Sequence, residues 1–127
     1  MNNWFHFARI EQHPNGHDYL LCSEHYQGQT VIELDTGRRS DYTAKQSATD
    51  EELIIVGYYP SPDFLSIVVE ACYWGCPWGI VLCRFDDPLS LPWPVIREVW
   101  DAEPVGWGES GFRYAREDVE GLLSAGS

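Results

Sequence analysis

Four side chains that could hold a metal ion fall into two short pairs. Two residues separate Cys22 from His25, and three separate Cys72 from Cys76. Thiolate and imidazole are ligands that zinc prefers, and four of them can enclose the ion as a tetrahedron. Both spacings are loose, however, and the cysteines lie mostly within apolar segments, which favours buried, reduced thiols. We therefore expect no cofactor, and we keep these four residues as weak metal candidates.

Groups suited to catalysis are less evident. All four histidines lie in the first quarter of the chain, but residues 13–17 contain Pro-Asn-Gly, which indicates a tight turn. No serine or cysteine stands in a nucleophile-elbow context. Adjacent acids, such as Asp86 and Asp87 or those at 50–52, point in different directions, whereas an acid–base pair faces across a cleft. The sequence therefore predicts that the protein is not an enzyme.

Aromatic residues are more abundant than a core of this size needs, with six Trp and seven Tyr among 127 residues. Large rings at loop tips are typical anchors of protein interfaces. The segment 86–109 also carries six acids against one base, Arg97, and interleaves them with Trp. Packing of the rings into the core or against the edge of the fold is the alternative. The residues predicted to bind a partner are Tyr26, Tyr73, Trp74, Trp78, Asp86, Asp87, Trp93, Trp100, Asp101, Glu103 and Trp107.

The pattern along the chain is that of a β protein. Short segments rich in β-branched and aromatic residues are separated by Gly, Pro, Asn and Asp. Helix signals are scarce: residues 116–123 are predicted to form one short C-terminal helix with Val119, Leu122 and Leu123 on one side. The predicted strands are 19–22, 30–34, 53–56, 65–71 and 79–85.

Two segments of the chain repeat one design. Asp18-Tyr19-Leu20 and Asp63-Phe64-Leu65 each begin a predicted strand, and each strand leads into an aromatic-rich hairpin. Residues 59–65 resemble the Ser-Pro-Asp turn that opens the second strand of many β-propeller blades, and residues 31–37 resemble a blade's third strand and the turn after it. A period of about 45 residues is also the size of one four-stranded blade.

The resemblance implies blade-like units at about 13–43 and 53–97, followed by a Trp- and acid-rich segment at 98–127. A closed propeller needs at least about four blades, and this chain holds two and a fraction. We therefore expect a single domain, residues 1–127, that is mainly β. It is an antiparallel meander of two blade-like units packed as a compact sandwich, unless several chains assemble a ring.

The charge limits the choice of partner. Twenty acids against eight bases give a net charge of −12, and Lys45 is the one lysine. A field of that sign repels nucleic-acid phosphates and anionic lipids, and it attracts basic proteins. The sequence shows no secretory signal and no apolar run of membrane-spanning length. We therefore expect a cytoplasmic protein that binds neither nucleic acid nor membrane.

Small size, acidity, surplus aromatic rings and missing catalytic motifs together predict a non-enzymatic binding protein. The concrete hypothesis is an immunity or inhibitor protein of bacterial type that neutralises a basic toxin such as a nuclease. Its carboxylates would take the positions of nucleic-acid phosphates in the toxin cleft. Two alternatives stay open: a small metal-binding or catalytic β protein that uses the Cys/His cluster, and a structural module that associates edge to edge into a homo-oligomer.

Overall fold

The computed structural model describes residues 5–24, 27–42, 54–72, 78–117 and 119–124, and these form eleven β-strands. The strands make three antiparallel meanders, which we call the N-terminal, central and C-terminal sheets. The N-terminal sheet contains β1 (Phe5–Ile10), β2 (Tyr19–Glu24), β3 (Gln27–Glu33) and β4 (Arg39–Tyr42); the central sheet contains β5 (Ile54–Pro60), β6 (Ser66–Cys72), β7 (Gly79–Arg84) and β8 (Val95–Trp100); the C-terminal sheet contains β9 (Glu103–Gly108), β10 (Gly111–Arg116) and β11 (Val119–Leu123).

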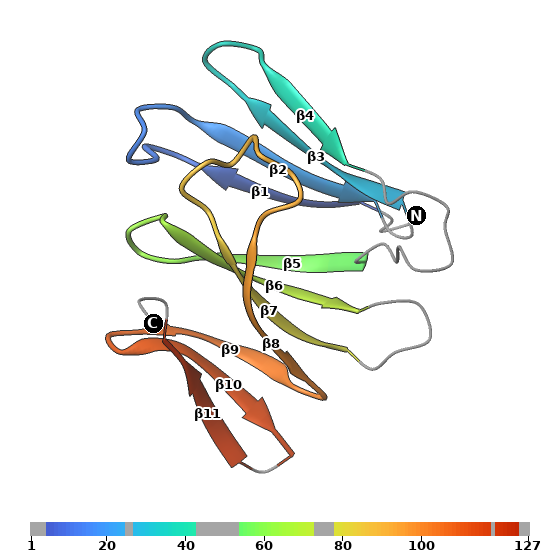
Figure 1. Cartoon of the computed structure of the whole chain (residues 1–127), viewed down its shortest axis with the longest axis vertical. Coiled ribbons are helices and arrows are strands. Elements are labelled where there is room, and N and C mark those ends of the chain that lie inside the picture. Colours follow the sequence, from blue (N-terminus) through green and yellow to red (C-terminus); the bar gives the residue numbers. More distant parts are fainter. Residues whose placement is uncertain (1–4, 25–26, 43–53, 73–77, 118, 125–127) are drawn as a thin grey trace.

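The three sheets are stacked in a row with the central sheet in the middle (Figure 1). One core lies between the N-terminal and central sheets, where Leu21 and Val31 meet Ile67 and Val69. A second core lies between the central and C-terminal sheets, where Val68 meets Phe112. All of these side chains are essentially removed from solvent. Burial of each is worth about 1.5–3 kcal/mol relative to exposure, so both interfaces stabilise the stack.

The central position of β6 and β7 follows from their sequence. Successive side chains of a strand point to opposite faces, so a strand covered on both faces needs apolar residues throughout. Residues 67–69 and 80–83 are such uninterrupted apolar runs, and every one of them is buried. β4 by contrast alternates exposed and half-buried residues, because only one of its faces is covered.

The mainly β character is therefore confirmed, and all five predicted strands overlap observed ones, namely β2, β3, β5, β6 and β7. The prediction of two sheet units is wrong, because the described residues form three sheets. The segment 98–127, expected to be a Trp- and acid-rich extension, contains all three strands of a third sheet that covers the second face of the central sheet. The described sheets also stand in a row and do not close a ring (Figure 1).

The predicted C-terminal helix is also wrong, since the described residues contain no helix and 119–123 form β11. Of the three apolar residues expected on one helix face, only Leu123 is buried, whereas Val119 is 69% and Leu122 is 51% exposed. Gly121 weakens a helix and here lets the ring of Tyr114 lie directly over the strand backbone. None of the described segments is a helix of the length and hydrophobicity needed to span a membrane.

Two turns at one end of the stack share a hydrogen-bond pattern. In the β1–β2 turn the His17 N–H donates to Asn15 Oδ1, and in the β5–β6 turn the Leu65 N–H donates to Asp63 Oδ1, both at 3.0 Å. A residue with positive φ follows in each turn, Gly16 at 91° and Phe64 at 59°. By this criterion Asp63 corresponds to Asn15, and not to Asp18 as the sequence comparison suggested.

Candidate binding site

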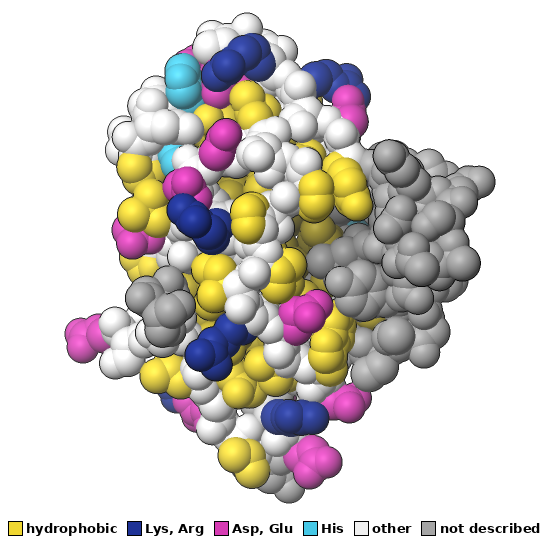
Figure 2. Space-filling view, viewed as in Figure 1, with side chains coloured by type: hydrophobic (Ala, Val, Ile, Leu, Met, Phe, Trp, Pro, Cys, Tyr) yellow, Lys and Arg dark blue, Asp and Glu magenta, His cyan; other side chains and the backbone are white. Residues whose placement is uncertain are grey.

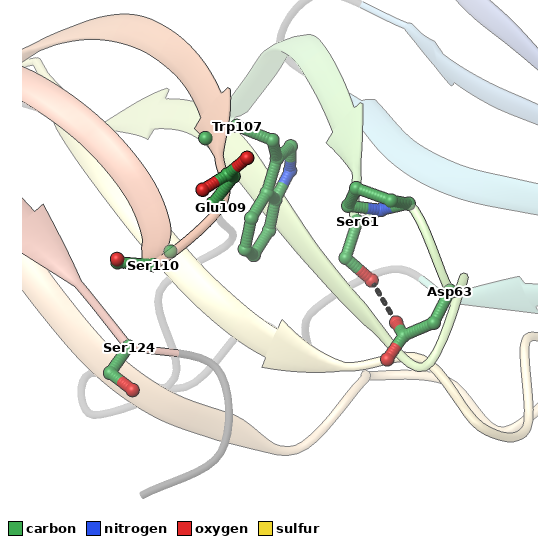
Figure 3. Close-up of a pocket in the computed structure, with 9 residues that line it drawn as sticks. Ser61, Asp63, Trp107, Glu109, Ser110 and Ser124 are labelled. Carbon is green, nitrogen blue, oxygen red and sulfur yellow. Dashed lines mark hydrogen bonds between the residues drawn. The ribbon is translucent and has the colours of Figure 1, made fainter.

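An open hollow of about 550 Å³ lies where the turns of the central and C-terminal sheets meet (Figure 3). One wall is the β5–β6 turn and the other is the β9–β10 hairpin, and the residue after β11 completes the rim. The lining residues are Ser61, Pro62, Asp63, Trp107, Gly108, Glu109, Ser110, Gly111 and Ser124.

The β5–β6 turn holds its carboxylate in a fixed position. Asp63 Oδ1 accepts hydrogen bonds from Ser61 Oγ at 2.6 Å and from the Leu65 N–H at 3.0 Å. The Ser61 hydroxyl in turn accepts from the Ser66 N–H at 3.1 Å. The bond from Ser61, followed by the one from Leu65, lowers the pKa of Asp63. The hollow therefore contains a carboxylate that stays ionised at neutral pH.

Trp107 forms a rigid apolar part of the wall. Its indole Nε1–H donates to the Tyr59 carbonyl oxygen at 2.7 Å, which connects the C-terminal sheet to β5. Its ring packs edge-on against Phe112 with centroids 5.4 Å apart. In Figure 3 the indole lies between Glu109 and Ser61. A half-buried ring that is fixed on two sides can contact a ligand without a large loss of side-chain entropy.

The β9–β10 hairpin brings the remaining polar groups to the rim. Glu109 and Ser110 are the exposed residues between the two strands. Gly111 has φ of 143°, and a Cβ there would overlap the Leu123 carbonyl. This close approach places Ser124 beside the hairpin, where it lines the same hollow.

The hollow thus combines two carboxylates, three serine hydroxyls and one indole ring. Serine needs a neighbouring base to act as a nucleophile. Among the lining residues there is no histidine or lysine, and His13 and His17 lie in the β1–β2 turn. The groups that are present can bind a cation with its apolar stem, because carboxylates pair with ammonium or guanidinium groups and indole attracts them as well.

The two carboxylates of the hollow differ from those of Glu11, Glu33, Asp41, Asp86 and Glu120, each of which pairs with an arginine. Within the described residues neither Asp63 nor Glu109 forms an ion pair. Figure 2 shows one face of the molecule, on which acidic side chains lie singly among arginines instead of forming a continuous patch. The ion pairs within single sheets or turns are Arg9–Glu11, Arg38–Glu33, Arg39–Asp41, Arg84–Asp86 and Arg113–Glu120.

The structure separates the residues predicted to bind a partner, and of these only Trp107 lines the hollow. Trp93 is 5% exposed, donates its indole N–H to the Pro88 carbonyl and packs edge-on against Phe85 at 5.0 Å. It therefore fills the edge of the core between the N-terminal and central sheets, and it is not available as a surface anchor. Asp86 and Asp87, in the same loop, are exposed.

A further group of the predicted residues lies at the opposite ends of the strands. Trp78 is 42% exposed and its carbonyl accepts from the Asp101 N–H at 2.9 Å. Trp100 is half-buried against the core, and Glu103 is exposed at the start of β9. Tyr26, Tyr73 and Trp74 lie outside the described residues. The sequence analysis missed Asp63, although the Ser-Pro-Asp motif that it singled out was the available signal.

The described part of the proposed zinc cluster does not converge. Side-chain alternation puts Cys22 on the face of the N-terminal sheet that points away from the central sheet, because its neighbours Leu21 and Ser23 point inward. The same alternation puts Cys72 on the face of β6 that carries Val68. The described residues contain no group of three or more potential ligands. His25 and Cys76 lie outside these residues.

Cys22 and Cys83 are free thiols. Burial raises the pKa of Cys83 to about 12 and also raises the pKa of Cys22. Thiols of this kind are protonated at neutral pH and therefore weak nucleophiles.

A second polar arrangement surrounds Glu33, whose side chain is almost completely buried at the end of β3. Its carboxylate accepts from Tyr19 at 2.9 Å, Thr36 at 2.6 Å and Arg38 at 2.9 Å. Burial raises the pKa of Glu33, but these hydrogen bonds and the charge of Arg38 outweigh that effect and hold the pKa below its ordinary value. With its acceptors used internally, Glu33 is a structural carboxylate that fixes the β3–β4 turn.

No family model matches the chain, and no solved structure matches it significantly. It is similar to an uncharacterized protein of Acanthamoeba polyphaga mimivirus, with 32% identity over 74 residues, or 58% of this chain. The match covers 29% of the viral protein, so the chain spans less than a third of that relative's length. The name of the relative states no activity.

Proposed function

We propose that this chain is a non-catalytic binding module for a basic protein, and that the hollow receives an arginine or lysine side chain of the partner. The observation that carries the proposal is the position of Trp107 between two carboxylates, Asp63 and Glu109, that have no cation of their own among the described residues. The stem of the incoming side chain lies against the indole, and its charge pairs with the carboxylates.

The overall charge supports this function. At −12 the chain attracts a basic protein over a distance of about one Debye length and so accelerates encounter. Salt bridges occupy several other acids, whereas Asp63 and Glu109 stand together beside the ring of Trp107, where an incoming cation can pair with both. An interface of this kind loses affinity as salt concentration rises.

The finer form of the proposal is that the partner is a toxin such as a nuclease, neutralised in the cytoplasm by an immunity protein. Small size, acidity and a preformed cation-binding hollow support it. Titration with the protein encoded by a neighbouring toxin-like reading frame tests this immunity hypothesis. Tight binding at low salt that blocks the toxin is expected. A flat binding isotherm would reject the hypothesis.

The wider proposal is tested with a defined probe, an acetylated and amidated heptapeptide of alternating arginine and valine. Its affinity is measured at low salt by isothermal titration calorimetry. The double variant Asp63→Asn/Glu109→Gln is expected to bind the peptide roughly tenfold more weakly, because charge-assisted contacts are lost. The matched control Asp101→Asn/Glu103→Gln removes the same charge at the opposite strand ends and should retain most of the affinity. Equal losses in both variants would show that net charge, and not the hollow, controls binding.

A further inference from the structure

Among the described residues the C-terminal sheet has one strand fewer than the other two sheets. The N-terminal and central sheets are four-stranded meanders in simple sequential order, whereas the described part of the C-terminal sheet is a meander of three strands with β11 at its border. Among the described residues β11 pairs with β10 alone, in continuous register from Phe112–Leu123 to Arg116–Val119. Figure 1 shows β11 at the outer border of the stack, with no element beyond it. One edge of this strand therefore offers unpaired backbone N–H and C=O groups.

The edge of β11 is less protected than the comparable outer edge of β4. Proteins commonly block free edges with charged residues and short strands. β4 has four residues and carries the Arg39–Asp41 ion pair. β11 has five residues, and its Glu120 is engaged by Arg113 of the adjacent strand. Its Val119 and Leu122 are exposed and apolar, so the edge attracts another strand more than it repels one.

The end of this edge leads into the hollow. Ser124 directly follows β11 and lines the hollow together with Asp63 and Glu109. A segment that runs along β11 therefore ends at the Ser124 rim of the hollow, from which a long basic side chain can extend toward the carboxylates. The segment must therefore cover apolar side chains along β11 and present a positive charge at the hollow. An extended segment with alternating side chains can do both, because its apolar residues cover Val119 or Leu122 while a basic residue enters the hollow.

We propose that β11 accepts an extended basic segment of the partner as a fourth strand of the C-terminal sheet. The inference rests on the proposed function, and it specifies the partner's contribution as an extended strand instead of a helix or a scattered surface. Backbone hydrogen bonds to β11 supply sequence-independent affinity, and the hollow selects for arginine or lysine at one position.

The test uses the arginine–valine heptapeptide in two N-methylated forms, one methylated at residues 2, 4 and 6 and one at residues 3, 5 and 7. Alternate N–H groups of a strand point to opposite edges, so only one form loses the hydrogen bonds to β11. That form is expected to bind roughly tenfold or more weakly than the other, because two or three backbone hydrogen bonds are lost. Both forms keep the same charge and composition, so each serves as the control for the other.

The outcomes separate this inference from the proposed function. If both methylated forms bind equally but Asp63→Asn/Glu109→Gln still weakens binding, the hollow binds cations and strand addition is wrong. If neither the methylation pattern nor the hollow variants change affinity, both proposals fail. A chain that dimerises by light scattering, and that becomes monomeric on Leu122→Lys, would show that a second copy occupies the edge, which also overturns the inference.

Discussion

The imidazole of His13, in the turn between β1 and β2, donates a hydrogen bond from Nε2 to the carbonyl oxygen of Phe85, 72 residues further along the chain, at 2.8 Å. Its Nδ1 accepts from the Asn15 N–H at 3.1 Å. Because a carbonyl only accepts and an amide N–H only donates, the ring is neutral and carries its proton on Nε2. One buried side chain thus joins the N-terminal sheet to the end of β7.

His13→Ala is expected to lower the free energy of unfolding by about 2–4 kcal/mol, since it removes two hydrogen bonds and leaves a cavity. The cavity opens between two rings that now pack edge-on against the imidazole, Tyr19 at 5.6 Å and Phe85 at 5.5 Å. Urea denaturation followed by tryptophan fluorescence measures the change. The control Glu11→Ala, which removes an exposed ion pair, should stay within about 0.5 kcal/mol of the parent protein. If His13→Ala lowered the free energy of unfolding no more than Glu11→Ala, the contact between His13 and Phe85 would not stabilise the packing of the two sheets.

Glu33 gives the protein a defined sensitivity to acid. Its pKa in the folded state lies below the ordinary value of 4.5, so its contribution to stability is fully present above that value and is lost as pH falls through the folded-state pKa. Glu33→Gln is expected to be less stable than the parent at pH 7, because Arg38 then faces a neutral amide. The difference should shrink as the pH is lowered through 4.5 and below.

The measurement is a series of urea denaturation curves between neutral and acidic pH. Some acid sensitivity must persist in Glu33→Gln, because hydrogen bonds from His17 and Ser61, respectively, also lower the pKa values of Asp35 and Asp63. A constant difference between the two proteins at every pH would contradict the assigned role of the Glu33 carboxylate.

Two tyrosines are expected to respond in opposite ways to loss of the hydroxyl group. The hydroxyl of Tyr58 is buried near the side chains of Ser23 and Gln29 but forms no hydrogen bond of good geometry among the described residues, and burial raises its pKa far above the ordinary value. The hydroxyl of Tyr19 donates to Glu33 at 2.9 Å and accepts from Asn15 Nδ2 at 2.7 Å. Removing a bonded hydroxyl leaves its partners unsatisfied, whereas removing an unbonded one relieves a desolvation cost.

Tyr58→Phe should therefore leave the free energy of unfolding unchanged or raise it by up to about 1 kcal/mol, and Tyr19→Phe should lower it by about 1–2 kcal/mol. Each variant serves as the control for the other, because both delete a single oxygen from a ring that packs in the same core. Thermal and urea unfolding measure the two changes. Destabilisation by Tyr58→Phe would show that the hydroxyl is hydrogen-bonded in solution, either to Ser23 or Gln29 or to a water molecule.

The sequence by itself determined the β class and the charge, and it contained the signal for a central layer, although the sequence analysis predicted only two units. Residues 67–69 and 80–83 are uninterrupted apolar runs, and such runs have to be covered on both faces wherever they lie. The strands with one exposed face, such as 39–42 and 95–100, carry mixed side chains whose local pattern is weak, and the sequence analysis missed them.

Only the tertiary structure decided which residues meet. Nothing local distinguishes Trp93, which is buried, from Trp78, which is exposed, or the buried acid Glu33 from the exposed Asp35 two residues later. The hollow likewise needs the β5–β6 turn and the β9–β10 hairpin to come together, and that contact depends on the packing of Val68 against Phe112. Local patterns record how a segment prefers to fold, whereas burial and site formation depend on long-range contacts between sheets.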